Sequence, residues 1–335
     1  MSRFRLIAAG TMLCAAASLS AQDLASSVCP AGTITLGIPD QQRAAQDACQ
    51  QAYDLYQLMA PQLGLALVGG STTMGQGGAL GGLPHFTLGV RVNALSGMIP
   101  DVSQFTQSTN GAQRQVLPTK TQVIGLPTVD AAIGLFKGLP LGVTNVGGVD
   151  LLVNAMYIPE VTSSGVTIKP SKTLSFGYGA RVGLIQESLL VPGVSVSIMK
   201  RDIPETDITA TSGSNSLKAL KTTVKTQAWR VMASKSLLLF SLHGGFGKET
   251  YDQSTDISAT VSQGGFTGNT SVPGTKQSLS RTNVFGGVTL NLLVVKLIAE
   301  VGQSSGGKVA TFNSFSGGRA DKSQVYGSAG IRIGF

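Results

Sequence analysis

Residues 322–335 read KSQVYGSAGIRIGF, and this closing stretch decides how the rest of the chain is interpreted. Its side chains alternate in character from one position to the next. One face carries only apolar or small residues, namely Val325, Gly327, Ala329, Ile331, Ile333 and the terminal Phe335. Because successive side chains of a strand point to opposite faces, the stretch predicts a β-strand with one apolar and one polar face.

A final strand that alternates in this way and ends on Phe335 resembles the closing strand of Gram-negative outer-membrane β-barrel proteins. The resemblance implies an assembly signal read by the barrel-assembly machinery, with the terminal aromatic ring at the periplasmic edge. The residues expected to carry that signal are Tyr326, Ile331, Ile333 and Phe335. As architecture the resemblance covers residues 86–335, and its specific motif is confined to the last strand, so no single family is indicated.

The first residues predict export. Arg3 and Arg5 precede an apolar run from Leu6 to Ala17, and small residues follow at Ser18, Ser20 and Ala21. This is the pattern of a cleaved secretory signal peptide, which we place at residues 1–21. Loss of its two arginines leaves 23 basic against 17 acidic residues, a net charge of +6.

Composition favours a barrel that faces lipid. Charged residues make up 13% of the chain and 43 of its 335 residues are glycine. After the signal peptide no stretch approaches the roughly 18–20 apolar residues of a helical span. A secreted β-sandwich or solenoid is the alternative, and an aromatic content of 6% is low for the interfacial belts of a barrel. A modest basic excess without interleaved aromatics argues against nucleic acid as a partner.

Residues 22–84 are expected to form a separate N-terminal segment. Cys29 and Cys49 predict one disulfide in an oxidising compartment, with two free thiols or a metal pair as alternatives. A helical pattern begins at Pro39 and Asp40 and continues to Pro61. The glycine-rich residues 64–82 then read as a linker or a plug inside the barrel, because they lack the Lys and the strand–helix context of a phosphate loop. In composition this segment resembles the N-terminal hatch of FadL-type long-chain fatty-acid transporters.

Residues 85–335 are expected to form an all-β, antiparallel transmembrane barrel of about ten strands, within a range of ten to fourteen. Nine further segments alternate like the last one, at 86–94, 129–136, 149–157, 174–184, 194–199, 223–233, 238–246, 284–292 and 295–302. Short connections alternate strictly with long polar ones, which we place at 95–128, 159–173, 203–222, 251–280 and 304–321. This is the arrangement of periplasmic turns and extracellular loops.

Strand parity assigns a set of polar residues to the lumen. Outward-facing charge near the bilayer midplane costs about 2–4 kcal/mol for Arg or Lys, so these side chains should point inward. The candidates are Arg91, Asp130, Asp150, Asn154, Arg181, Arg230, His243, Lys296, Glu300 and Arg332. Five are positive and three negative, which predicts a mildly basic lumen. Either an open or gated pore or a closed core of ion pairs is compatible with this set.

Catalysis is not expected. The chain has two histidines, His85 at the start of the first strand and His243 near the middle of the seventh. Neither lies at the extracellular rim, where omptin-like proteases need one, and Ser241 shares a face with His243 at a spacing that arises easily by chance. The sequence also predicts no metal and no cofactor.

Two functions fit this reading of the sequence. The first is a channel or transporter for small solutes in the outer membrane, with outer-membrane lipid and the assembly machinery as partners. The second is a structural or surface-binding barrel that transports nothing and acts through its extracellular loops.

Overall fold

The structure is a computed structural model that describes residues 25–30, 39–73, 75–163, 165–263 and 266–334. The predicted signal peptide and Phe335 lie outside the described residues. Among the helices that the structure describes, none has the length and apolar character needed to cross a membrane.

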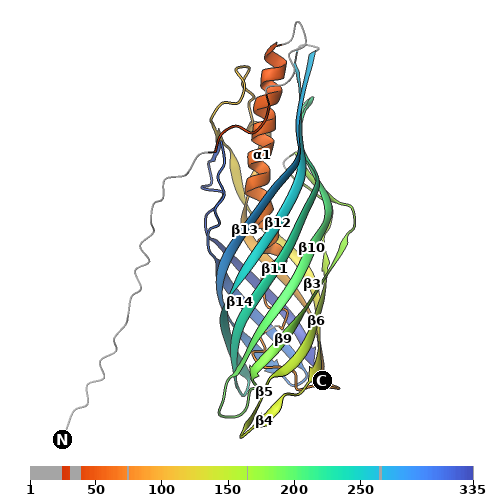
Figure 1. Cartoon of the computed structure of the whole chain (residues 1–335), viewed down its shortest axis with the longest axis vertical. Helices are drawn as coiled ribbons and strands as arrows, with labels where there is room; N and C mark the ends of the chain where they lie inside the picture. Colours follow the sequence, from red (N-terminus) through yellow and green to blue (C-terminus); the bar gives the residue numbers. More distant parts are fainter. Residues whose placement is uncertain (1–24, 31–38, 74, 164, 264–265, 335) are drawn as a thin grey trace, which may run out of the picture.

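Ten antiparallel strands close into a ring, which confirms the predicted fold class and strand number (Figure 1). The last strand pairs with the first, and β10 pairs with β11, so the ladder has no break around the circumference. In chain order the ring consists of β1 (Phe86–Pro100), β3 (Thr119–Phe136), β6 (Gly148–Tyr157), β9 (Leu174–Ile185), β10 (Gly193–Ser212), β11 (Asn215–Leu237), β12 (Phe240–Gln263), β13 (Phe266–Leu292), β14 (Val295–Ser304) and β16 (Gln324–Gly334).

In the described part of the chain, the connections between these strands contain seven short elements of secondary structure. They are the 3-10 helix η1 (Val102–Gln104), β2 (Val116–Leu117), β4 (Leu139–Leu141), β5 (Thr144–Val146), β7 (Val161–Ser163), β8 (Val166–Pro170) and β15 (Ser314–Phe315). The hairpin of β4 and β5 and the C-terminal end of β16 lie at one end of the ring, which we call the turn end (Figure 1). The opposite end, which carries the connections 101–118, 158–173 and 305–323, is called the loop end.

Two of the connections expected to be polar loops are instead strand, so that part of the sequence interpretation is wrong. Most of 203–222 belongs to β10 and β11, and most of 251–280 belongs to β12 and β13. Most of the polar residues that suggested loops lie on the outer face of these extensions. Their inner face is buried and mainly apolar, with Ile208, Leu217, Ile257 and Leu279 among its residues.

The extended parts of β10 to β13 remain in strand conformation because a helix covers their inner face. The 30-residue helix α1 (Pro39–Val68) enters the ring from the loop end and contacts β11, β12 and β13 (Figure 1). Its buried side chains join the inward residues of the extensions in one hydrophobic core. Burial of this apolar surface stabilises strands that would otherwise project into solvent.

Helix α1 runs further than predicted, because Pro61 lies inside it rather than at its end. Proline removes one intrahelical hydrogen bond, and side-chain contacts of the next residue hold this part of the helix against β1. The Gln62 amide donates to the carbonyls of Leu58 (2.9 Å) and Met98 (3.0 Å), and it accepts from the Met98 N–H (2.6 Å). The two hydrogen bonds with Met98 attach the C-terminal half of α1 to β1.

The outer surface carries the apolar half of each strand. Exposed large apolar side chains occur on all ten ring strands, as in Val90, Val182, Leu242, Val288 and Ile331. Tyr157, Phe176 and Tyr178 form an exposed aromatic group where β6 and β9 approach the loop end. A continuous apolar belt around a closed barrel is the surface that lipid covers.

Candidate functional site: a filled lumen and apolar pockets beside α1

The part of the ring interior nearer the turn end is filled by the chain itself. Residues 69–83, apart from Met74, are called here the plug segment; they connect the end of α1 to the start of β1. Gly70 has φ +72°, and a Cβ there would meet Arg91 Nη1 at 2.6 Å. Gly77 lies against the backbone of β10 and β11, because a Cβ there would sit 2.6 Å from the Gly193 carbonyl. A plug packed this closely against the wall requires glycine at these two positions.

Arginines of the wall bind the backbone of this segment and of the helix end. Arg91 Nη1 donates to the Gly69 carbonyl at 2.7 Å, and Arg230 Nη2 donates to the Val68 carbonyl at 2.7 Å. Further along, Arg332 donates to Thr73 O (2.5 Å) and Arg181 to Gln76 O (2.9 Å). Charged donors satisfy carbonyls that no regular secondary structure would pair.

Carboxylates of the wall form ion pairs with several of these arginines. Arg91 pairs with Asp130, Arg181 with Asp150 (2.7 Å), and Arg230 with Glu249 (3.2 Å) and Glu300 (3.7 Å). Asp150 also accepts from the Leu80 N–H at 3.0 Å, so one carboxylate holds both the wall and the plug segment. All these side chains are buried.

The structure therefore places nine of the ten lumen candidates in buried positions, among them Asn154 and His243. Lys296 is the exception and is half-buried, near the turn end. His243 Nε2 lies 3.5 Å from a Glu300 oxygen, whereas Ser241 bonds to Ser236 and Asn291. His85 bonds to the Gly82 carbonyl at 2.9 Å through Nδ1.

Three buried charged residues of the ring strands were missed from the sequence, namely Arg201, Glu249 and Arg281. Arg201 lies beyond 194–199, the segment taken as the fifth strand. Glu249 and Arg281 flank the supposed loop 251–280. All three share the parity of the inward faces of β10, β12 and β13, so longer strand assignments would have found them.

At the loop end, two carboxylates of α1 hold the neighbouring connections. Asp47 accepts from the backbone N–H groups of Ser108 and Gln113, both at 2.9 Å. Asp54, two helical turns further on, accepts from the N–H groups of Phe312 (3.0 Å) and Asn313 (2.9 Å). Burial raises the pKa of Asp54 to about 6, against the lowering effect of these hydrogen bonds.

The predicted disulfide is present. Cys29 and Cys49 are joined with a Cα–Cα distance of 6.0 Å, which ties residues 25–30 to the loop-end half of α1. Gln46 reinforces the tie by donating to the Cys29 carbonyl at 3.0 Å. No cluster of His, Cys, Asp and Glu that could hold a metal ion occurs within the described part of the chain.

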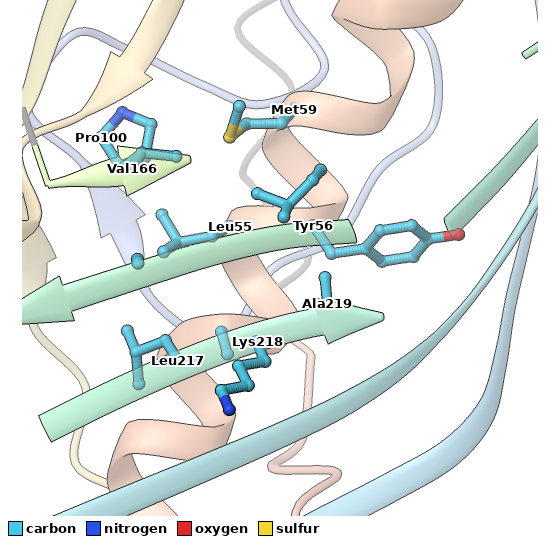
Figure 2. Close-up of a pocket in the computed structure, with 11 residues that line it drawn as sticks. Leu55, Tyr56, Met59, Pro100, Val166, Leu217, Lys218 and Ala219 are labelled. Carbon is cyan, nitrogen blue, oxygen red and sulfur yellow. The ribbon is translucent and has the colours of Figure 1, made fainter. Parts of the chain in front are cut away.

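A small apolar pocket of about 30 Å³ lies between α1 and the extended wall (Figure 2). Leu55, Tyr56 and Met59 of the helix face Leu217 and Ala219 of β11 across it. Pro100 of β1 and Val166 of β8 close its third side.

A second and larger apolar pocket of about 240 Å³ adjoins the first, since Met59 lines both. Its other walls include Met98 of β1 and residues 122–125 of β3, with Val161 of β7 opposite. Along Thr119–Pro127 the described pairings join β3 to β1 alone, because its ladder with β6 begins only at Thr128. Strand β7 pairs with β8, so an unpaired interval in the wall separates β3 from β7 beside this pocket.

The residues assigned to the assembly signal do not all share one face. Ile331 is exposed on the apolar belt and Ile333 is partly exposed. Tyr326 points the opposite way and is buried, where its ring lies close to Gly69 and Gly302. Within β16 it contacts the plug segment and not the lipid-facing surface.

No protein-family model and no curated protein sequence matches this chain. Among solved structures it is similar to the Pseudomonas putida toluene transporter TodX, with TM-score 0.31 and 8% identity over 75% of this chain and 88% of that one. It is also similar to a loop-deletion mutant of OmpT of Vibrio cholerae, with TM-score 0.19, 8% identity and coverage of 75% and 99%. The outer-membrane channel DcaP of Acinetobacter baumannii matches with TM-score 0.16, 11% identity and coverage of 75% and 96%.

The closed antiparallel ring with an outward apolar belt is the architecture of outer-membrane β-barrels, and this assignment rests on the topology and burial described above. At these scores the likeness concerns architecture and not the ligand.

Proposed function

We propose that this protein resides in the outer membrane of a Gram-negative bacterium and binds small apolar solutes for passage across it. The observation that supports this most is the pair of adjoining apolar pockets that meet at Met59. Both lie at the loop end, which we take to be extracellular, so a solute would reach them without displacing the charged plug network. Outer-membrane lipid and the barrel-assembly machinery are the partners that such a protein needs.

The route that we propose is lateral. The polar interior nearer the turn end is occupied by the plug segment, and its arginines are already engaged by carboxylates and carbonyls. An apolar solute gains nothing by entering such a region, because the buried polar groups would lose their partners. The unpaired interval between β3 and β7 opens from the second pocket toward the apolar belt, where an uncharged solute is stable.

In this proposal the mildly basic lumen predicted from the sequence is a closed polar region that blocks passage through the ring. Displacement of the plug segment would be needed before its charges faced a continuous aqueous path. The runner-up function, a barrel that transports nothing, is favoured by the same occupied interior.

Methyl NMR on the protein labelled at its methionine methyl groups tests the binding step. On addition of ethylbenzene, the Met59 and Met98 signals should shift saturably, because both side chains line the pockets. Met156 and Met232 are buried outside these pockets and should not respond. Equal shifts at all four methionines, or no saturation, would contradict a specific apolar site.

Uptake of radiolabelled ethylbenzene by cells that express the protein tests passage. Met59→Glu places a charge in both pockets and should abolish the uptake that the wild type supports. Leu242→Met changes an exposed residue of the outer belt and serves as the control. Binding by the wild type without any increase in uptake would favour the surface-binding alternative.

A further inference from the structure

A small polar cavity lies where the plug segment meets β10 and β11. Ser71 and Thr72 of the plug segment, Ser197 and Arg201 of β10, and Arg230 of β11 line it. It has room for about one water-sized particle. None of these five residues lines the apolar pockets described above.

Arg201 enters this cavity without an acidic partner. Its side chain is buried, its Nη2 donates to the Thr72 hydroxyl, and its Nε has no hydrogen-bond acceptor. Among the described residues, no carboxylate lies within ion-pair distance of it, whereas Arg91, Arg181 and Arg230 each contact at least one. Arg230 lines the cavity as a second cation, and its Nη1 makes no hydrogen bond although it lies 3.7 Å from a Glu300 oxygen.

A guanidinium stays protonated at any physiological pH. The buried side chain of Arg201 therefore keeps its positive charge. An ionised group away from water is strongly disfavoured unless an opposite charge compensates it. The described barrel interior has a surplus of such cations. Six buried arginines (Arg91, Arg181, Arg201, Arg230, Arg281 and Arg332) face four buried acids (Asp130, Asp150, Glu249 and Glu300).

We propose that the cavity binds a monatomic anion of the size of chloride. The unused Nε–H of Arg201 donates to it, and the guanidinium of Arg230 on the adjacent strand β11 adds a second positive charge. The hydroxyl of Thr72, which already accepts from Arg201, is left with its own proton to donate. A water molecule would fill the same space but would leave the charge of Arg201 uncompensated.

The anion would join the plug segment to the wall, since its donors come from both. Chloride would therefore stabilise the closed interior. This proposal does not depend on the apolar solute proposed above, because the two sites share no residue.

Chloride-35 NMR on the purified full-length protein in detergent tests the site. In the wild type, the chloride line should broaden saturably, and bromide should reverse the broadening by competition. Arg201→Gln should weaken the affinity by about tenfold or more, because a charge-assisted contact is lost. Arg281→Gln is the matched control, since Arg281 is also buried and makes no ion pair among the described residues, yet lies outside the cavity.

Thr72→Val keeps both arginines and should weaken chloride binding by about fivefold, the effect of one hydrogen bond. This variant decides the question if Arg201→Gln does not fold. Absence of saturable broadening in the wild type would mean that water alone fills the cavity and would overturn the proposal. Unchanged affinity in Arg201→Gln, or in Thr72→Val when Arg201→Gln is unfolded, would overturn it as well.

Discussion

Asp54 illustrates how one buried carboxylate organises the loop end. It accepts hydrogen bonds from two consecutive backbone N–H groups, of Phe312 and Asn313, and from the Asn313 side chain at 2.8 Å. The same burial that isolates these bonds from water raises the pKa of Asp54 to about 6. The acid therefore binds its proton more tightly in the folded protein than in the unfolded chain.

This shift predicts the sign of a pH effect. The folded state holds more protons than the unfolded state between about pH 4 and pH 6, so the contribution of Asp54 to stability falls as the pH rises through that window. The loss should be about 3 kcal/mol, the equivalent of roughly two pKa units. Asp54→Asn should remove it, which urea unfolding in detergent at several pH values would detect.

Asp40→Asn provides the control on the same helix, because Asp40 is exposed and bonds only to Arg43 within the described residues. Its pH profile should match that of the wild type. A wild-type stability that rises between pH 4 and pH 6 relative to Asp54→Asn would contradict the assignment.

At the scale of elements, the plug segment depends on glycine where it touches the wall. A Cβ at Gly77 would overlap the Ser234 backbone nitrogen and sit 2.6 Å from the Gly193 carbonyl. Gly77→Ala should therefore displace the plug segment and allow small ions to leak through the ring. Conductance in a planar bilayer is the measurement.

Gly286→Ala is its counterpart on β13, where the nearest atom to an added Cβ is the His243 carbonyl at 3.6 Å. It should leave conductance at the wild-type level. Equal conductance of the two variants would show that the segment does not close the interior by packing.

The disulfide acts on the same N-terminal element. It closes a loop of 20 residues between Cys29 and Cys49, which corresponds to about 3 kcal/mol of chain entropy in the unfolded state. Replacing both cysteines with serine should reduce the unfolding free energy by about that amount, as measured by urea unfolding. Reduction of the wild type by dithiothreitol should reproduce the effect, and a stability unaffected by either treatment would exclude a structural role.

For the whole molecule, the two ends of the ring predict opposite accessibility. Gly213 turns β10 into β11 at the loop end, and Gly142 turns β4 into β5 at the turn end. Both have positive φ and open space around them, so each should tolerate an inserted epitope tag. On intact cells an antibody should reach the tag at 213 and not the tag at 142, because the loop end is the proposed extracellular side.

Permeabilised cells should expose both tags and so supply the control. Binding to the tag at 142 alone on intact cells would reverse the orientation, and with it the proposed access to the apolar pockets.

The sequence by itself determined the barrel. The period-two alternation that ends on Phe335 repeats in every strand of the ring, and strand parity is a local property that needs no knowledge of distant contacts. For the same reason parity was enough to place Arg91, Asp130, Arg181 and Glu300 on the inner face. The cysteine pairing followed from composition and spacing.

The tertiary structure decided what fills the ring. The extensions of β10 to β13 look like loops in the sequence because half of their residues are polar, and only the presence of α1 makes the other half a core. The partners of the inward charges are equally non-local: Arg230 contacts Glu249, Glu300 and the Val68 carbonyl, which are far apart along the chain. Alternation specifies which side of a strand a residue occupies, whereas the path of the N-terminal segment through the ring specifies what that residue meets.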